Sequence, residues 1–108
     1  MTYKVYQINL TDDEVDTINK ANDHFAIPKG KANMDAMVGK YDPANFKFYE
    51  HVADIDAAGL EDVFEIGNIG PEEKITRHAP MHSLSVGDIV EDPTGARSIV
   101  KMMGYEAI

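Results

Sequence analysis

The sequence predicts an α+β protein with a small mixed or antiparallel sheet of about four strands, roughly two or three short helices and a C-terminal β-hairpin. Stretches of alternating apolar and polar residues, typical of strands, occur near both ends of the chain. Apolar residues at helical spacing lie between them, and turn residues separate the segments. The chain has 108 residues, of which 44% are hydrophobic, so we expect one core and a single domain over residues 1–108.

The N-terminal third contains one predicted strand and two predicted helices. Residues 3–10 alternate and are rich in β-forming side chains, which predicts a strand. Thr11 and Glu14 match a capping box, in which each side chain accepts a hydrogen bond from the other residue's backbone. A helix should therefore begin there and end just before Pro28. A weaker apolar stripe over residues 32–38 predicts a second helix.

The middle of the chain predicts a second strand and a short helix. Residues 46–52 carry aromatic side chains on both faces, as in a central strand. Asp56 is a good N-cap, and the helix that follows should run to residue 66 and end at Gly67. The apolar residues that this helix should bury are Leu60, Val63 and Phe64.

The C-terminal part predicts a long surface loop followed by a hairpin. Residues 67–81 are polar and contain glycine and proline, which is typical of a loop, with one turn of helix compatible with residues 72–75. Strands over residues 88–91 and 96–103, joined by a turn at 92–95, form the predicted hairpin. Gly104 then bends the last residues.

Composition excludes several classes of protein. The chain has no cysteine, which removes disulfides, thiolate zinc sites and cysteine nucleophiles and indicates a reducing compartment. Its formal net charge of −9 opposes direct binding to nucleic acid or to anionic membranes. No apolar run approaches the roughly 18 residues of a membrane span, and the N-terminus does not resemble a secretory leader. We therefore expect a soluble cytoplasmic protein with neither nucleic acid nor membrane as a direct partner.

The negative charge is concentrated in one part of the chain. Between residues 48 and 73 there are eight acidic residues and no Lys or Arg. They are Glu50, Asp54, Asp56, Glu61, Asp62, Glu65, Glu72 and Glu73. If the predicted helix buries its apolar stripe, its acids project together beside the loop acids, and such a face attracts basic partners. The alternative is that this charge only keeps the protein soluble.

The most specific pattern lies in the C-terminal half, in a short LEDVFE segment and a later HSLSVGDIV segment. The motif residues are His82, Ser83, Leu84, Ser85, Val86 and Asp88, followed by Gly104 and Tyr105. Their order and spacing resemble the YodL-like domain family over most of the chain. The resemblance implies a small α/β protein of phages and integrative mobile elements, active in the host cytoplasm, and no established reaction. The chain departs from the family pattern at Gly67, Met102 and Met103.

One alternative is catalysis at this motif. His82 beside Ser83 and Ser85 suggests a base next to a nucleophile, as in a small hydrolase or a metal-dependent enzyme. Asp88 and His78 would assist. No Gly-x-Ser-x-Gly elbow presents either serine, so the favoured interpretation is that the hydroxyls bond backbone groups in a turn.

Metal and cofactor sites are not expected. His78 and His82 are four residues apart, but Pro80 between them opposes the helix that would bring their imidazoles together. His24 and His51 are isolated in the sequence, so we assign them surface or core-edge positions. No glycine-rich phosphate loop occurs either. We therefore expect no metal and no cofactor.

These observations favour a protein that acts by binding and not by catalysis. We expect a small acidic phage or mobile-element protein that binds a host protein, itself basic or nucleic-acid-binding, in host takeover or anti-defence. DNA mimicry, in which carboxylates imitate phosphates, is a sharper form of the same hypothesis. A further alternative is an oligomeric structural or assembly component, which exposed Met102 and Met103 would favour; the sequence leaves the oligomeric state open.

Overall fold

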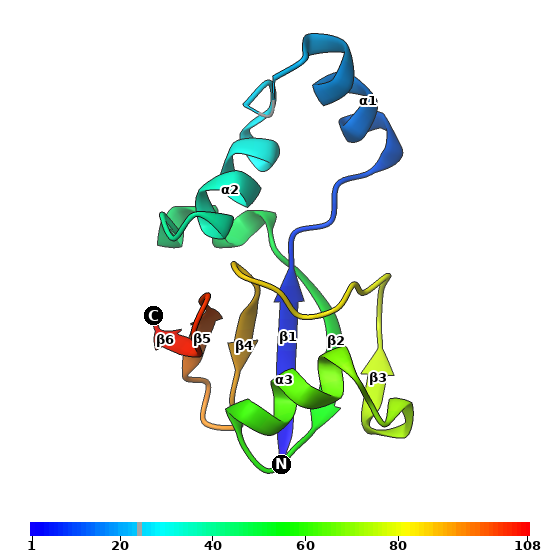
Figure 1. Ribbon diagram of the computed structural model, residues 1–108, viewed down its shortest axis with the longest axis vertical. Helices are drawn as coiled ribbons and strands as arrows, with labels where there is room; N and C mark the ends of the chain where they lie inside the picture. The colour runs from blue at the N-terminus through cyan, green and yellow to red at the C-terminus, as the bar shows by residue number, and fades with distance from the viewer. Residues whose placement is uncertain (24) are drawn as a thin grey trace.

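A computed structural model describes residues 1–23 and 25–108, and its central element is one antiparallel sheet (Figure 1). Within the described residues the sheet has six strands in the order β3-β2-β1-β4-β5-β6. The strands are β1 (Thr2–Gln7), β2 (Glu50–Asp56), β3 (Ile75–Arg77), β4 (Ile89–Glu91), β5 (Arg97–Val100) and β6 (Tyr105–Ala107). The protein is therefore α+β with an antiparallel sheet, as the sequence predicts, but the sheet is larger than the expected size of about four strands.

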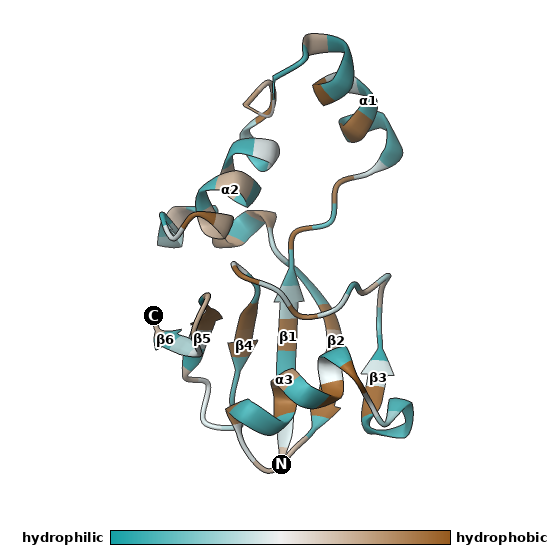
Figure 2. Cartoon of the chain, viewed as in Figure 1, coloured by the Kyte–Doolittle hydropathy of each residue, from teal (hydrophilic) through white to brown (hydrophobic). Residues whose placement is uncertain are grey.

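Helix α3 (Leu60–Asn68) covers one face of the sheet, in front of β1 and β2 (Figure 1). Side chains of a strand alternate between the two faces, and Tyr3 and Val5 of β1 point toward this helix. They pack with Ile55 of β2 and with Val63 and Ile66 of α3, all of them buried. Figure 2 shows hydrophobic residues along the central strands and α3, so the core lies between the helix and this face of the sheet.

Two further helices lie beyond one end of the sheet and lengthen the molecule to 43 Å, against 25 and 22 Å in the other directions (Figure 1). They are α1 (Asp12–Ala21) and α2 (Pro28–Met37). The predicted capping box is confirmed, because the Glu14 amide donates to Thr11 Oγ1 at 3.2 Å and the Thr11 amide donates to Glu14 Oε1 at 2.8 Å. Asn22 adopts a left-handed conformation and ends α1 earlier than predicted. Pro28 occupies the first turn of α2 and does not end α1.

The strand predicted over residues 46–52 is wrong in position. A 3-10 helix, η1 (Pro43–Phe48), occupies its first half. The Asp42 carboxylate accepts from the Ala44 amide at 2.9 Å, and the proline that follows Asp42 suits a first helical position. Strand β2 begins only after η1. Asp56 is the last residue of β2 and does not cap the next helix, which begins after Gly59.

Gly67 lies inside α3 and does not end it, in contrast to the prediction. A Cβ atom at this position would lie 2.6 Å from Cδ1 of the buried Leu84. The glycine therefore lets the segment around Leu84 pack closely against the helix. The buried stripe of α3 also differs from the prediction, since Ile66 is buried whereas Phe64 is 42% exposed.

The segment predicted as a loop over residues 67–81 contains regular structure. It begins with the last residues of α3, continues through a second 3-10 helix, η2 (Glu72–Lys74), and forms the edge strand β3. Strand β3 pairs with β2, so that Ile75 lies opposite Ile55. A strand of three residues is too short for an alternation pattern to reveal it.

The predicted C-terminal hairpin is confirmed and consists of β4 and β5. The Asp92 side chain stabilises its turn by accepting from the Thr94 amide at 2.8 Å. The second strand ends at Val100, earlier than predicted. Gly104, with a φ of 80°, then reverses the chain, and Tyr105 pairs back onto Val100 as the first residue of β6.

Candidate functional site

The eight acidic residues of the predicted binding face do not share one face. The acids of α3 are Glu61, Asp62 and Glu65. Because Ile55 of β2 packs in the core beneath α3, strand alternation directs its neighbours Asp54 and Asp56 to the opposite face of the sheet. The expectation of one continuous acidic face is therefore corrected, and the reason is the two-residue period of β2.

Several of these carboxylates have partners within the protein. Asp56 lies 3.2 Å from the N-terminal amine, and Asp62 accepts from the Ala58 amide at 2.9 Å. Glu72 is paired with Arg77, whose hydrogen bond holds the pKa of Glu72 below its ordinary value. Of these eight acids, the exposed ones that form no ion pair with another described residue are Glu50, Glu61, Glu65 and Glu73.

Exposed apolar side chains lie next to the acids of α3. Phe64 is 42% exposed, and Met102 and Met103, in the turn between β5 and β6, are 91% and 93% exposed. A hollow of about 240 Å³ separates the helix from this turn. Its lining residues are Glu61, Phe64, Lys101, Met102, Gly104 and Tyr105. We define the α3 surface as Glu61, Phe64, Glu65, Met102 and Met103.

The polar groups of this hollow leave it negative in character. Lys101, the cation among the lining residues, lies 3.5 Å from Glu106 and is neutralised by it. The Tyr105 hydroxyl is buried and has no hydrogen-bond partner among the described residues. Burial and the nearby Asp88 raise the pKa of Tyr105 to about 12, so this phenol stays neutral. The carboxylate of Glu61 therefore dominates the charge of the hollow.

The HSLSVGDIV segment is anchored to the sheet by Gln7, a fully buried polar residue of β1. The Gln7 amide group accepts from the His82 backbone N–H at 3.2 Å and donates to the His82 carbonyl at 2.9 Å. It also donates to Asp88 at 3.0 Å, and Asp88 accepts from the Ser85 amide at 2.9 Å. The turn before β4 is thus held by Gln7 and Asp88, and not by the serine hydroxyls as the sequence suggested.

This segment lacks the contact between a nucleophile and its base. His82 Nδ1 bonds the Ser83 carbonyl at 2.8 Å and lies 3.9 Å from Asp88. In the part of the chain that the structure describes, neither serine hydroxyl bonds an imidazole. His82, Ser85 and Asp88 do line a hollow of about 320 Å³, but burial raises the pKa of Asp88 to about 6 and its hydrogen bonds go to the scaffold. The geometry therefore indicates an anchoring role more directly than hydrolysis.

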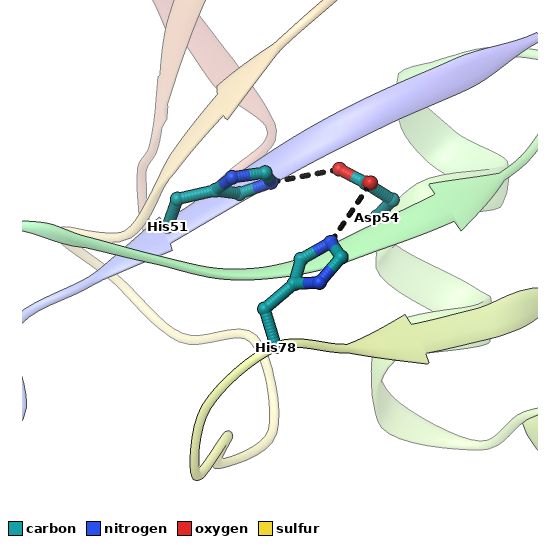
Figure 3. A group of neighbouring side chains, drawn as sticks. All are labelled: His51, Asp54 and His78. Atoms are coloured by element: carbon teal, nitrogen blue, oxygen red, sulfur yellow. Dashed lines mark hydrogen bonds and ion pairs between the residues drawn. The ribbon is translucent and has the colours of Figure 1, made fainter.

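A second polar group, formed by His51, Asp54 and His78, lies on the face of the sheet opposite α3 (Figure 3). The Asp54 carboxylate accepts from His51 Nε2 at 2.7 Å and from His78 Nε2 at 2.9 Å. The centroids of the two imidazole rings are 4.8 Å apart. The three side chains thus converge on one point.

A β-bulge brings His51 and Asp54 to the same face. Residues three apart on a regular strand point to opposite faces. Val5 of β1 pairs with Ala53 of β2. The next residue of β1, Tyr6, pairs with His51, so β2 contains one extra residue, and the residues beyond the bulge change face.

The third member comes from the edge of the sheet. His78 directly follows β3, and its backbone N–H donates to the Val52 carbonyl at 2.8 Å. Sequence reasoning missed the group because a bulge has no local sequence pattern and β3 was part of a predicted loop. His51 is partly exposed, as predicted, but it is not isolated in three dimensions, because it contacts Asp54 and His78. His78 contacts Asp54 and does not assist His82. His24 lies outside the described residues.

The donor atoms of this group suit a metal ion. Partial burial on its own would raise the pKa of Asp54, but the hydrogen bonds from His78 and His51 outweigh it, and the pKa lies below its ordinary value. Two imidazole nitrogens and one carboxylate oxygen lie within 4.8 Å of one another. Such a set of donors can hold a divalent transition metal.

Comparisons of the chain with protein-family models, with curated proteins and with solved structures give no match. The resemblance to YodL-like domains therefore stays a prediction based on the motif residues. Among the described residues, no helix is both long and apolar enough to traverse a bilayer.

Proposed function

We propose that the protein is a non-enzymatic binding module whose α3 surface docks a basic segment, with one apolar face, of another protein. One observation carries the proposal: exposed Phe64 and Met102 line a hollow that also contains Glu61, and the next residue, Met103, is exposed as well. Exposed apolar side chains bordered by charge are typical of protein interaction sites.

The apolar members of the α3 surface supply the anchor. An exposed aromatic side chain such as Phe64 contributes a large apolar area to binding when a partner covers it. Aromatic residues are accordingly enriched among the residues that dominate binding energy. Met102 and Met103 are unbranched and flexible, so they adapt to the shape of the partner. The hollow of about 240 Å³ offers room for one partner side chain.

The acidic members select the charge of the partner. Glu61 and Glu65 are one helical turn apart on α3, and the segment from residue 48 to 73 contains no Lys or Arg. Carboxylates placed in this way raise the rate of encounter with a basic partner, over a Debye length of about 8 to 10 Å at ordinary salt.

In the setting that the YodL-like resemblance implies, the partner is a host protein, basic or nucleic-acid-binding, and the outcome is host takeover or anti-defence. DNA mimicry is not part of this proposal. A DNA mimic needs a continuous row of carboxylates, whereas Asp54 and Asp56 of β2 lie on the face of the sheet opposite the acids of α3, and Glu72 is neutralised by Arg77.

The test is affinity capture from bacterial lysate at low ionic strength with matched charge variants. The wild type and the control Glu73→Lys, which changes an exposed acid outside the α3 surface, should retain the same partner. The double variant Glu61→Lys/Glu65→Lys should lose it, and added salt should weaken capture by the wild type. Equal capture by all three proteins would contradict the proposal.

Sedimentation equilibrium separates a host partner from self-association. If the wild type forms an oligomer that Phe64→Ser/Met102→Ser/Met103→Ser returns to a monomer, the α3 surface joins copies of this chain and the host-partner proposal is wrong. A monomeric wild type leaves the surface free for a different protein, as proposed. All three positions are exposed, so the substitutions leave the core unchanged.

A further inference from the structure

We infer that His51, Asp54 and His78 form a binding site for a divalent transition-metal ion, with zinc as the favoured ion. The site lies on the face of the sheet opposite α3. Metal binding there would therefore be separate from partner binding at the α3 surface. Figure 3 shows the three side chains turned toward one another, and their ligand atoms lie within 4.8 Å of one another.

The chemistry of the donors defines the class of ion. Two imidazole nitrogens and one carboxylate oxygen suit zinc and its first-row neighbours, whereas calcium and magnesium prefer oxygen ligands throughout. The chain has no cysteine, so a thiolate site for the same ions is excluded. Imidazole and carboxylate together are the zinc ligands that this sequence can offer.

The spacing of the donors is close to that of a tetrahedral zinc site. Bonds of about 2.0 to 2.2 Å place two ligand atoms roughly 3.3 to 3.5 Å apart in a tetrahedron. His51 Nε2 lies 2.7 Å from Oδ1 of Asp54, and His78 Nε2 lies 2.9 Å from Oδ2 of the same carboxylate. Insertion of the ion therefore requires each of these nitrogen–oxygen pairs to separate by roughly half an ångström. The three ligand atoms, now within 4.8 Å of one another, must at the same time converge to about 3.5 Å.

The backbone around the site is fixed, while the side chains keep some freedom. The bulge in β2 positions His51 and Asp54, and the pairing of β3 with β2 positions His78, which directly follows β3. The side chains of His51, Asp54 and His78 are 35%, 29% and 41% exposed, so each can rotate slightly without disturbing the core. A scaffold of this kind supplies ligands at little entropic cost.

The number of protein ligands predicts the character of the site. Three protein ligands leave one position of a tetrahedral ion for water, the arrangement of an open site and not of a closed structural one. The partial exposure of all three side chains gives solvent access to that position. The bound ion should therefore be exchangeable and removable by a chelator.

The test is calorimetric titration of the chelator-treated protein with zinc chloride. The wild type should bind one ion. Since even the loss of an outer partner of a metal ligand weakens binding about 10- to 100-fold, His51→Gln and His78→Gln should each bind zinc at least about 100-fold more weakly. His82→Gln is the matched control, because His82 is also a partly exposed histidine near a carboxylate, and it should bind as the wild type does.

A second measurement keeps the test decisive. Cobalt(II), substituted for zinc, reports a tetrahedral site by its visible absorption, which should appear with the wild type and with His82→Gln and be absent with His78→Gln. Circular dichroism of the metal-free variants checks that each is folded. Equal zinc affinity in the wild type and in His51→Gln/His78→Gln, or loss of binding in His82→Gln alone, would overturn the assignment. Neither result bears on the α3 surface.

Discussion

The described residues contain two histidine–aspartate groups, and they differ in what surrounds the carboxylate. The Asp88 side chain is only 7% exposed, and its hydrogen bonds come from Gln7 and from a backbone amide. The Asp54 side chain is 29% exposed, and its hydrogen bonds come from two imidazoles. The buried Asp88 carboxylate therefore stabilises the fold, whereas the partly exposed Asp54 carboxylate is accessible to a ligand. A histidine near an aspartate in the sequence does not distinguish these two cases.

If Asp88 belongs to a buried anchor, the largest loss of stability is expected when Gln7, its buried hydrogen-bond partner, is replaced. Gln7→Ala removes the three hydrogen bonds that join β1 to His82 and Asp88 and leaves a cavity at a fully buried position. Each lost hydrogen bond is worth about 1 kcal/mol, so the free energy of unfolding should fall by about 3 kcal/mol or more. Urea denaturation measures this change.

Asn9→Ala is the matched control for Gln7→Ala. Asn9 also carries a side-chain amide, which donates to the Pro80 carbonyl at 2.7 Å, but this hydrogen bond is solvent-exposed. Its removal should lower the free energy of unfolding by less than about 1 kcal/mol. Equal losses in the two variants would show that Gln7 does not anchor the motif segment.

The second effect concerns the charge of Asp88. Burial raises its pKa from 3.8 to about 6, against the opposing effects of the Ser85 amide, His82 and Gln7. The folded state therefore binds the proton more tightly than the unfolded state, and this group makes the protein less stable as the pH rises from 3.8 toward about 6. A neutral isostere should remove that loss of stability.

Asp88→Asn tests this expectation. The Gln7 and Ser85 N–H groups both donate to Oδ2 of Asp88, and the amide oxygen of asparagine can accept both hydrogen bonds. Above pH 6 the variant should be more stable than the wild type by up to about 3 kcal/mol, and the difference should vanish only below the unfolded-state pKa of 3.8. Chemical denaturation across this pH range gives the difference directly. A constant difference at every pH would mean that Asp88 is not the titrating group.

Features determined by neighbouring residues were predictable from the sequence. The capping box of Thr11 and Glu14 provides hydrogen-bond partners for backbone N–H groups at the start of α1, and both residues are close in the sequence. The turn at residues 92–95 likewise pairs β4 with β5, which are neighbours in the sequence. Features that depend on distant contacts were not. Gly67 matches a helix stop by local rules, yet it lies inside α3 because Leu84 packs against it.

The candidate sites follow the same division. The run of acids was visible in the sequence, but alternation along β2 and ion pairs such as Glu72–Arg77 divide it in three dimensions. The group around Asp54 depends on a bulge and on the pairing of a three-residue edge strand, neither of which has a local signature. Only the distances between His51, His78 and Asp54 make it recognisable.

The smallest effect on the free energy of unfolding is expected at the partly exposed group of His51, Asp54 and His78, in contrast to the large effect expected at the buried Gln7. In zinc-free buffer, His78→Gln should change the free energy of unfolding by less than about 1 kcal/mol, since exposed ion pairs contribute little. Zinc at about 100 times the wild-type dissociation constant should then stabilise the wild type by about 2.7 kcal/mol, and the variant, which binds zinc at least about 100-fold more weakly, by no more than about 0.4 kcal/mol. A loss of several kcal/mol without zinc would instead make this group a structural ion pair, equivalent in role to the anchor formed by Asp88.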